Sequence, residues 1–148
     1  MTFIKSGSIT TASIILLLIV ACRLNAQTDR AEILATLDRQ VAYWNEGKID
    51  SFMIGYLPTD SLMFIGKSGL DYGYLNTLEN YQKHYPDKAS MGTLLFAIQN
   101  LKPLGSKYYF VVGKWSLKRP EKGDLTGYFS LLWKKIKGKW KIIADHSS

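Results

Sequence analysis

Residues 108–148 read YYFVVGKWSLKRPEKGDLTGYFSLLWKKIKGKWKIIADHSS, and their pattern is the strongest indication of the fold class. Apolar and polar residues alternate along it, which is typical of strands with one buried face. Residues 119–123 and Lys137-Gly138 have the composition of hairpin connections. Bulky side chains dominate one face of each of two strands, in the rows Tyr109, Val111, Gly113, Trp115, Leu117 and Leu125, Gly127, Phe129, Leu131, Trp133. Such apolar rows must be buried against another layer of structure. The segment therefore predicts an antiparallel sheet packed against a second layer.

The same pattern extends back to Met91, where a further strand begins and runs to a connection at Pro103-Leu104-Gly105-Ser106. Three long strands and one shorter strand are therefore predicted. Gly113 and Gly127 lie inside strands, where glycine often marks a sharp bend. We expect a curved sheet.

Before Pro86 the apolar residues recur with helical spacing. Asp29 and Glu32 form a capping box at the predicted start of the first helix, and Gly47 follows its end. Its apolar face is expected to hold Ile33, Leu37, Val41 and Trp44. A short second helix is expected to be capped by Asp50 and stopped by Pro58.

A short strand, Leu62 to Ile65, is closed by Gly66, and residues 67–73 are predicted to be a loop. A third helix follows and ends at Pro86. Its inward residues are expected to be Leu75, Leu78, Tyr81 and Tyr85. The fold class is therefore α+β, with three N-terminal helices packed on a curved antiparallel sheet.

The first 26 residues have the pattern of an export signal, because Lys5 precedes an apolar run from Ile14 to Ala21. The run is too short for a membrane span, which needs about 20 apolar residues. Cleavage after Ala26 would leave a soluble domain, residues 27–148, in the periplasm or outside the cell. Alternatively, residues 19–22 resemble a lipobox, and removal of residues 1–21 would leave an acylated Cys22 as a lipid anchor in the cell envelope. Both alternatives stay open, and no other membrane contact is predicted.

The sequence has a formal net charge of +7, and much of the lysine lies near the C-terminus. Basic residues interleaved with aromatic ones can bind nucleic acid. Here the lysines alternate around Gly138, as they do at a solvated hairpin tip, where they discourage pairing between sheet edges. Nucleic acid is therefore not predicted as a partner.

Several motifs together resemble a known family. They are YWNEGKID at 43–50, Phe52-Met53, DSLMF at 60–64 and WKIIADHSS at 140–148. Their order resembles the nuclear transport factor 2-like (NTF2-like) superfamily, specifically its DUF4440 and SnoaL-like exported bacterial members. Lys48 stands where that family often has Asp, and Ser147 where it often has Thr. The resemblance implies a cone-shaped α+β barrel with a deep pocket, and a homodimer formed through the outer face of the sheet.

Members of this superfamily include isomerases, cyclases and epoxide hydrolases as well as binding modules, so the fold leaves the function open. Isomerase-like members place a carboxylate near the end of the first strand, and residues 62–65 contain none. The epoxide hydrolases use an Asp-Arg-Asp arrangement. Arg30, Arg39 and Arg119 instead suit surface positions, so neither mechanism is expected.

His146 and Asp145 are the candidate catalytic residues, since an imidazole can exchange a proton near neutral pH. Neighbouring strand residues point to opposite faces. His146 shares the parity of Trp140 and Ile142, so it is predicted to face inward, with Asp145 capping the chain end or hydrogen-bonding to backbone. The alternative is that His146 only closes the barrel as a structural residue.

A set of aromatic residues is predicted to line an apolar pocket, with phenol hydroxyls as its few polar contacts. The set is Trp44, Tyr56, Phe64, Tyr72, Tyr74, Tyr81, Tyr85 and Trp115. The alternative is that most of them are ordinary core. Gly66-Lys67-Ser68 lacks the first glycine of a phosphate-binding loop. The histidines and carboxylates show no close metal-ligand spacing, so no metal and no cofactor are predicted.

Two functions follow from these observations. The favoured one is an exported module that binds a small hydrophobic molecule, or assembles as a dimer, without catalysis. The alternative is a proton-transfer enzyme of the isomerase, cyclase or hydrolase type that acts on a small carbonyl compound through His146 and a tyrosine.

Overall fold

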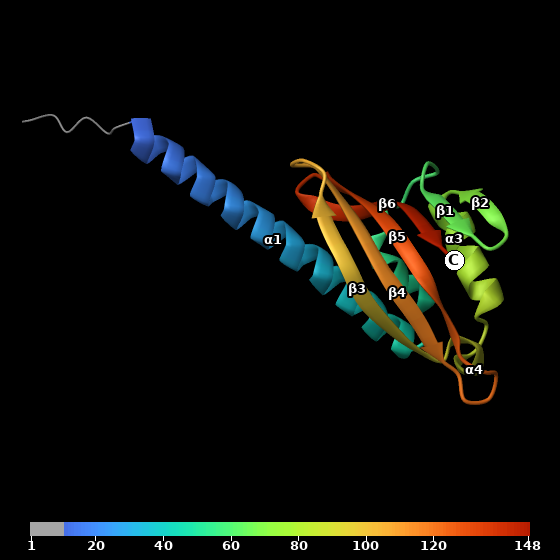
Figure 1. The fold of residues 1–148 in the computed structure, drawn as a ribbon. Coiled ribbons are helices and arrows are strands. Elements are labelled where there is room, and N and C mark those ends of the chain that lie inside the picture. The colour runs from blue at the N-terminus through green and yellow to red at the C-terminus, as the bar shows by residue number, and fades with distance from the viewer. Residues whose placement is uncertain (1–10) are drawn as a thin grey trace, which may run out of the picture.

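The computed structural model describes residues 11–148 (Figure 1). Within its first helix, the side chains of residues 11–13, 15–20 and 22–25 lie outside the described set. Residues 1–10 of the predicted export signal, and most side chains of the rest, including that of the lipidation candidate Cys22, therefore fall outside it. None of the helices in the described part of the chain is long and apolar enough to cross a membrane.

Helix α1 spans Thr11–Asn45, and its C-terminal half lies along one face of the sheet (Figure 1). The predicted start at Asp29 is wrong, because the helix continues through this residue. Asp29 instead accepts hydrogen bonds from Lys135 Nζ at 2.6 Å and Trp140 Nε1 at 2.9 Å, so its carboxylate ties the helix to the sheet. The predicted end is correct. Gly47 has φ +80°, and the amide of Lys48 donates to the carbonyl of Tyr43, as in a Schellman cap.

Helix α2 spans Ile49–Phe52 and continues into a 3₁₀ turn, η1, at Met53–Gly55. Asp50 lies inside α2 and does not cap it, since the residue before the helix is Lys48, which makes no side-chain cap. Strand β1, Met63–Gly66, is confirmed. The predicted loop contains a strand, β2 at Gly69–Tyr72, which pairs antiparallel with β1. Its side chains are mostly exposed, so the sequence carried no burial pattern there.

Helix α3 spans Tyr74–His84, and the short α4 spans Lys88–Met91. Leu78, Tyr81 and Tyr85 pack against the core as expected. Leu75 is 66% exposed, so its predicted inward position is wrong. Thr77 is buried in its place and donates its hydroxyl to the carbonyl of Gly73 at 2.8 Å.

The long strands are β3 (Thr93–Pro103), β4 (Tyr108–Lys118), β5 (Leu125–Ile136) and β6 (Lys139–Ser147). The sheet order is β2-β1-β6-β5-β4-β3, and β1 runs parallel to β6 while the other pairs are antiparallel. The three predicted connections are therefore confirmed, and so is the α+β class with helices packed on a curved sheet. The inner face of the sheet and the facing helices form the core.

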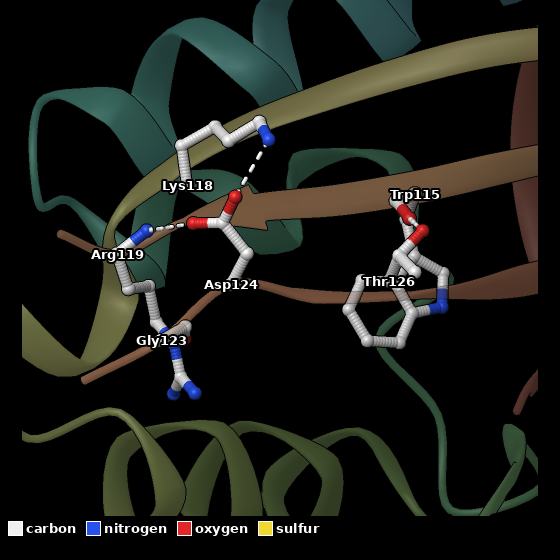
Figure 2. A network of polar contacts seen from close by, with 6 residues as sticks. All are labelled: Trp115, Lys118, Arg119, Gly123, Asp124 and Thr126. Atoms are coloured by element: carbon white, nitrogen blue, oxygen red, sulfur yellow. Dashed lines mark hydrogen bonds and ion pairs between the residues drawn. The ribbon is translucent and has the colours of Figure 1, made fainter.

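The β4–β5 connection holds together through side chains at its base (Figure 2). Asp124 accepts from the backbone amide of Arg119 at 2.9 Å and from Lys118 Nζ at 2.6 Å. Further along the strands, Thr126 Oγ1 donates to the carbonyl of Trp115 at 2.8 Å. This bond fixes the two strands together where Trp115 reaches the interior.

Gly113 and Gly127 lie where side chains or backbone approach the strand closely. A Cβ at Gly113 would lie 2.4 Å from Cζ of Phe129, and the register of β3 shifts between Ile98, its partner, and Asn100. A Cβ at Gly127 would lie 1.7 Å from the carbonyl oxygen of Ser148. The sequence predicted a sharp bend at these glycines, and the structure shows close approaches that only glycine permits, with a register shift beside Gly113.

Candidate functional site

A cavity of about 690 Å³ lies between the helices and the inner face of the sheet. Helices α1 and α3 contribute one wall, and strands β3 to β6 contribute the other, while Phe64 and Asp71 come from the short hairpin. Its size falls within the ordinary range for small-molecule sites. The pocket expected between helices and sheet is therefore present.

Six of the eight predicted pocket residues line this cavity: Trp44, Tyr56, Phe64, Tyr81, Tyr85 and Trp115. Tyr72 does not, and its side chain is 54% exposed at the end of β2. Tyr74 packs against the core without lining the cavity. Phe96 and Phe129 also line it, and the position of Phe129 in the buried row of β5 could have indicated this.

The aromatic side chains of the helical wall contact one another edge to face. The ring of Trp44 lies 5.1 Å from Phe52, 6.0 Å from Tyr81 and 4.8 Å from Tyr85, all in T-shaped arrangements. Phe64 joins them through Tyr81 at 5.7 Å. Such pairs add about 0.5–1.5 kcal/mol each beyond area burial, so these rings stabilise one another as a continuous aromatic surface.

A carboxyl group lies among these rings. Asp145 is 3% exposed; its Oδ2 accepts from the hydroxyl of Tyr56 at 2.6 Å, and its Oδ1 accepts from the hydroxyl of Ser147 at 2.8 Å. The hydroxyl of Tyr81 lies 3.4 Å from that of Tyr56. These groups form a polar cluster at Asp145 in an otherwise aromatic wall.

Burial raises the pKa of Asp145 to about 6, although the hydrogen bonds from Tyr56 and Ser147 and the charge of His146 act in the opposite direction. Burial and the negative charge of Asp145 hold the pKa of both Tyr56 and Tyr81 well above the usual value. The two phenols are therefore donors near neutral pH. The carboxyl group is poised to gain or lose a proton in the same range.

His146 is exposed, so its predicted inward orientation is wrong. The reason is a β-bulge: Trp133 pairs with Ile142 and Leu132 pairs with Ala144, so Ile143 is an extra residue in β6. An extra residue reverses the alternation that follows it. Asp145, which was predicted to cap the chain end, therefore faces the cavity, and His146 lies on the outer face beside Ser130.

A second carboxyl group faces the same cavity. Asp71 is in register with Phe64, which is in register with Asp145, so all three lie on one face of the sheet. Asp71 accepts a hydrogen bond from Asn80 Nδ2 at 2.9 Å, and the carbonyl of Asn80 is 2.7 Å from Nδ1 of His84. The sequence carries no signal for this group, because the strand that holds it, β2, is mostly exposed and shows no burial pattern.

The exposed residues Lys67, Ser68 and His84 lie at the rim of the cavity. Lys67 and Ser68 belong to the motif that was rejected as a phosphate loop, and in the fold they form the β1–β2 turn. Among the described residues, His, Cys, Asp and Glu side chains form no group of three or more that could hold a metal ion. The chemical options of the site therefore centre on Asp145, its hydroxyl partners and the aromatic wall.

No protein-family model and no curated protein matches this sequence. Solved structures do match it. An NTF2-like protein of unknown function from Shewanella oneidensis MR-1 is 42% identical, with a TM-score of 0.76, over 80% of this chain and 98% of that protein. A ketosteroid isomerase-like protein from Erwinia carotovora atroseptica is 17% identical, with a TM-score of 0.61, over 80% of this chain and 93% of that one.

An NTF2-like superfamily protein from Salmonella enterica serovar Typhimurium is 16% identical, with a TM-score of 0.62, over 83% of this chain and 92% of that one. At sequence identities of 16–17%, these two similarities support the fold only and not a function. The narrower DUF4440 and SnoaL-like assignments stay predictions. The Shewanella protein, by contrast, is similar in sequence over almost its whole length, and the chain described here therefore belongs to the NTF2-like family.

Proposed function

We propose that this protein binds a small, largely apolar molecule in the cavity, with a polar group of that molecule facing Asp145. The observation that carries the proposal is a cavity of about 690 Å³ that is lined mainly by aromatic and aliphatic side chains and opens to solvent at the rim formed by Lys67, Ser68 and His84. Concave, mostly apolar pockets of this size with a few polar groups are typical of small-molecule sites, whereas protein cores are close-packed. Aromatic residues that served only as core would be expected to close this space.

Native mass spectrometry of the protein purified from its own cells tests this proposal, because it retains non-covalent ligands. We expect a small-molecule adduct in the wild type. Leu125→Trp, which adds bulk at the cavity edge, should reduce the adduct, whereas Leu104→Trp is the matched control, since Leu104 is 46% exposed and is not a lining residue. An adduct that survives Leu125→Trp unchanged, or no adduct together with no binding of added naphthalene, would contradict the proposal.

A second candidate is proton transfer on a small carbonyl compound. It is favoured by one observation, the buried Asp145 with its raised pKa and the hydroxyl of Tyr56 2.6 Å away. A carboxylate with a pKa close to ambient pH is a suitable general base. The proton of Tyr56 is donated to Asp145, so the neutral phenol that can donate to a developing oxyanion is Tyr81, whose hydroxyl lies 3.4 Å from that of Tyr56. The base in this proposal is Asp145 and no longer His146, because His146 lies on the opposite face of the strand.

Proton exchange in deuterated water tests this second candidate. Loss of the α-proton signals of added ketones would be followed by nuclear magnetic resonance. We expect exchange with the wild type and with His146→Ala, and a loss of at least about 100-fold with Asp145→Asn, since removal of a general base lowers rates by this order. Equal exchange with Asp145→Asn and with wild type would contradict it.

We also propose that the protein is exported, from the sequence pattern of residues 1–26. Cys22→Ser distinguishes the two processing sites. If Cys22 is acylated, this substitution should move the protein from the membrane fraction to the soluble fraction. If cleavage follows Ala26, both forms should be soluble and begin at Gln27.

A further inference from the structure

The carboxylate of Asp145 has no cationic partner among the described residues. Their ion pairs involve Glu46, Asp124, Asp87 and Asp29, and none involves Asp145. An ionised carboxyl group that is buried without a counter-charge is strongly unfavourable, and buried charges in proteins are normally paired. The ionised carboxylate of Asp145 therefore lacks an ion-pair partner in the described part of the chain.

The groups that donate hydrogen bonds around Asp145 are uncharged hydroxyls, and the charge of His146 is the smallest of the effects that lower the pKa of Asp145. Tyr56 follows η1, Tyr81 comes from α3, and Ser147 comes from β6 itself. From β2 the charged group on this face is Asp71, about two strand spacings away, or roughly 10 Å, and it is negative. His146 lies on the outer face. Lys67 and His84 are exposed at the rim, where water and salt screen their charges.

The carboxylate also has acceptor capacity left. Each of its oxygens has room for two hydrogen bonds, and the side chains described above supply one to each, from Tyr56 and from Ser147. A group with several N–H donors and a positive charge would use the remaining capacity and supply the missing charge together. A neutral hydroxyl would supply a donor only, and an anion would be repelled by both Asp145 and Asp71.

The aromatic wall favours the same kind of group. Five aromatic side chains that line the cavity contact one another as one cluster: Trp44, Phe52, Phe64, Tyr81 and Tyr85. Asp145 lies beside this cluster and is hydrogen-bonded to Tyr56. Aromatic rings attract ammonium ions within about 6 Å, and more strongly when the ion is desolvated. The same rings provide apolar surface for the rest of a ligand.

We propose that the occupant of this cavity is a lipophilic amine, bound as its ammonium ion against the carboxylate of Asp145, with its hydrocarbon part among the aromatic rings. This inference rests on the ligand-binding function proposed above and names the chemical class of the ligand. It requires Asp145 to be ionised, so affinity should rise with pH through the range in which this carboxyl group loses its proton.

Three probes of matched shape separate the charge from the apolar contact: naphthylethylamine, naphthylethanol and naphthylacetate. Their affinities for the wild-type protein would be measured by isothermal titration calorimetry. We expect the amine to bind at least about tenfold more tightly than the alcohol, and the acid to bind most weakly. The affinity for the amine should increase by about tenfold between roughly pH 5 and pH 8, and that for the alcohol should change little.

Two substitutions of similar shape provide the controls. Asp145→Asn should weaken amine binding on the order of 100-fold, since it removes one partner of a buried charge pair, and should leave the alcohol within about threefold. Asp71→Asn removes the second carboxylate, which is less buried and already bonded to Asn80, and should have the smaller effect. Circular dichroism would confirm that both variants are folded.

The failures of this inference and of the proposed function are distinguishable. If the alcohol or the acid binds as tightly as the amine, or if Asp145→Asn binds the amine as tightly as wild type does, the amine inference is overturned while the cavity remains a binding site. If none of the three probes binds, both are overturned.

Discussion

At the scale of single residues, the orientation of the C-terminal strand decides which group can act. Asp145 and His146 are neighbours, and only one of them can face the cavity. The bulge at Ile143 places Asp145 inside and His146 outside. The acid therefore occupies the low-dielectric interior, and burial raises its pKa to about 6.

This shift predicts a pH dependence of stability. The pKa of Asp145 is about 6 in the folded state and 3.8 in the reference state, so the folded state holds the proton more tightly and loses stability as pH rises from roughly 4 through 6. At roughly 1.4 kcal/mol per pKa unit, the loss at neutral pH is about 3 kcal/mol. Asp145→Asn should abolish this pH-dependent loss of stability, because asparagine does not ionise.

Urea unfolding of wild type and Asp145→Asn at about pH 4 and about pH 7.5 measures this effect, because other groups cancel in the difference. The variant should gain about 2–3 kcal/mol relative to wild type between the two pH values. Asp38→Asn, at an exposed carboxylate on α1, should show no such change. Parallel pH profiles for wild type and Asp145→Asn would refute the assignment.

At the scale of elements, α1 is held on the sheet by a polar contact that replaces the predicted cap. Asp29 accepts from Lys135 and Trp140, and the ammonium of Lys135 lies 5.6 Å from the centre of the Trp140 ring. One turn earlier, the hydroxyl of Tyr109 donates to the carbonyl of Ala26 at 3.2 Å. These contacts fix the helix that supplies Trp44 to the cavity.

Asp29→Asn should lower the free energy of unfolding by about 1–3 kcal/mol, because hydrogen bonds to a charged group in a partly buried site have this value. Thermal and urea unfolding would measure the loss. Asp38→Asn, in the same helix and exposed, is the matched control and should change stability by less than about 0.5 kcal/mol. Equal effects of the two substitutions would show that Asp29 does not hold the helix in place.

The close approach at Gly113 makes a second prediction at this scale. Gly113→Ala places a Cβ 2.4 Å from Cζ of Phe129, which lines the cavity, so the ring must move. Overpacking of this kind costs about 1–3 kcal/mol. Urea unfolding should show this loss, and probe affinity should fall with it. Ser116→Ala, on the other face of β4, should affect neither, and a Gly113→Ala protein as stable as wild type would mean that the ring adapts freely.

At the scale of the whole molecule, the outer face of the sheet carries apolar side chains next to lysines. Leu95, Phe110 and Tyr128 are 50%, 37% and 53% exposed, on adjacent strands. Exposed apolar patches often mark interaction surfaces. The homodimer predicted from the family resemblance would bury this face, and a dimer through it remains a proposal.

Light scattering of the purified protein tests the dimer. We expect twice the monomer mass for wild type and the monomer mass for Phe110→Lys combined with Tyr128→Lys, because two buried lysines would face a like-charged copy. Leu104→Lys is the control, since Leu104 is 46% exposed in the β3–β4 turn, and it should remain dimeric. A monomer mass for wild type at high concentration would contradict the proposal.

The sequence by itself determined the fold class, the order of the long strands, the end of α1 at Gly47 and most of the aromatic pocket. These features follow from local periodicity, from turn composition and from motifs whose residues are close in the chain. A periodic pattern can be recognised in one segment alone, before the segments that pack against it are known. Trp44, Tyr81 and Trp115 could therefore be assigned to the interior.

Only the tertiary structure decided which acid faces the cavity, what Asp29 binds and how Asp71 joins the site. A bulge is defined by the pairing of two strands. Nothing within residues 139–147 indicates that Ile143 has no pairing partner on β5. Likewise, Asp29 can form a cap or an ion pair, and its distance from Lys135, 106 positions along the chain, becomes short only when α1 lies on the sheet. The charges and orientations of the site depend on contacts between distant segments, and local sequence carries no record of them.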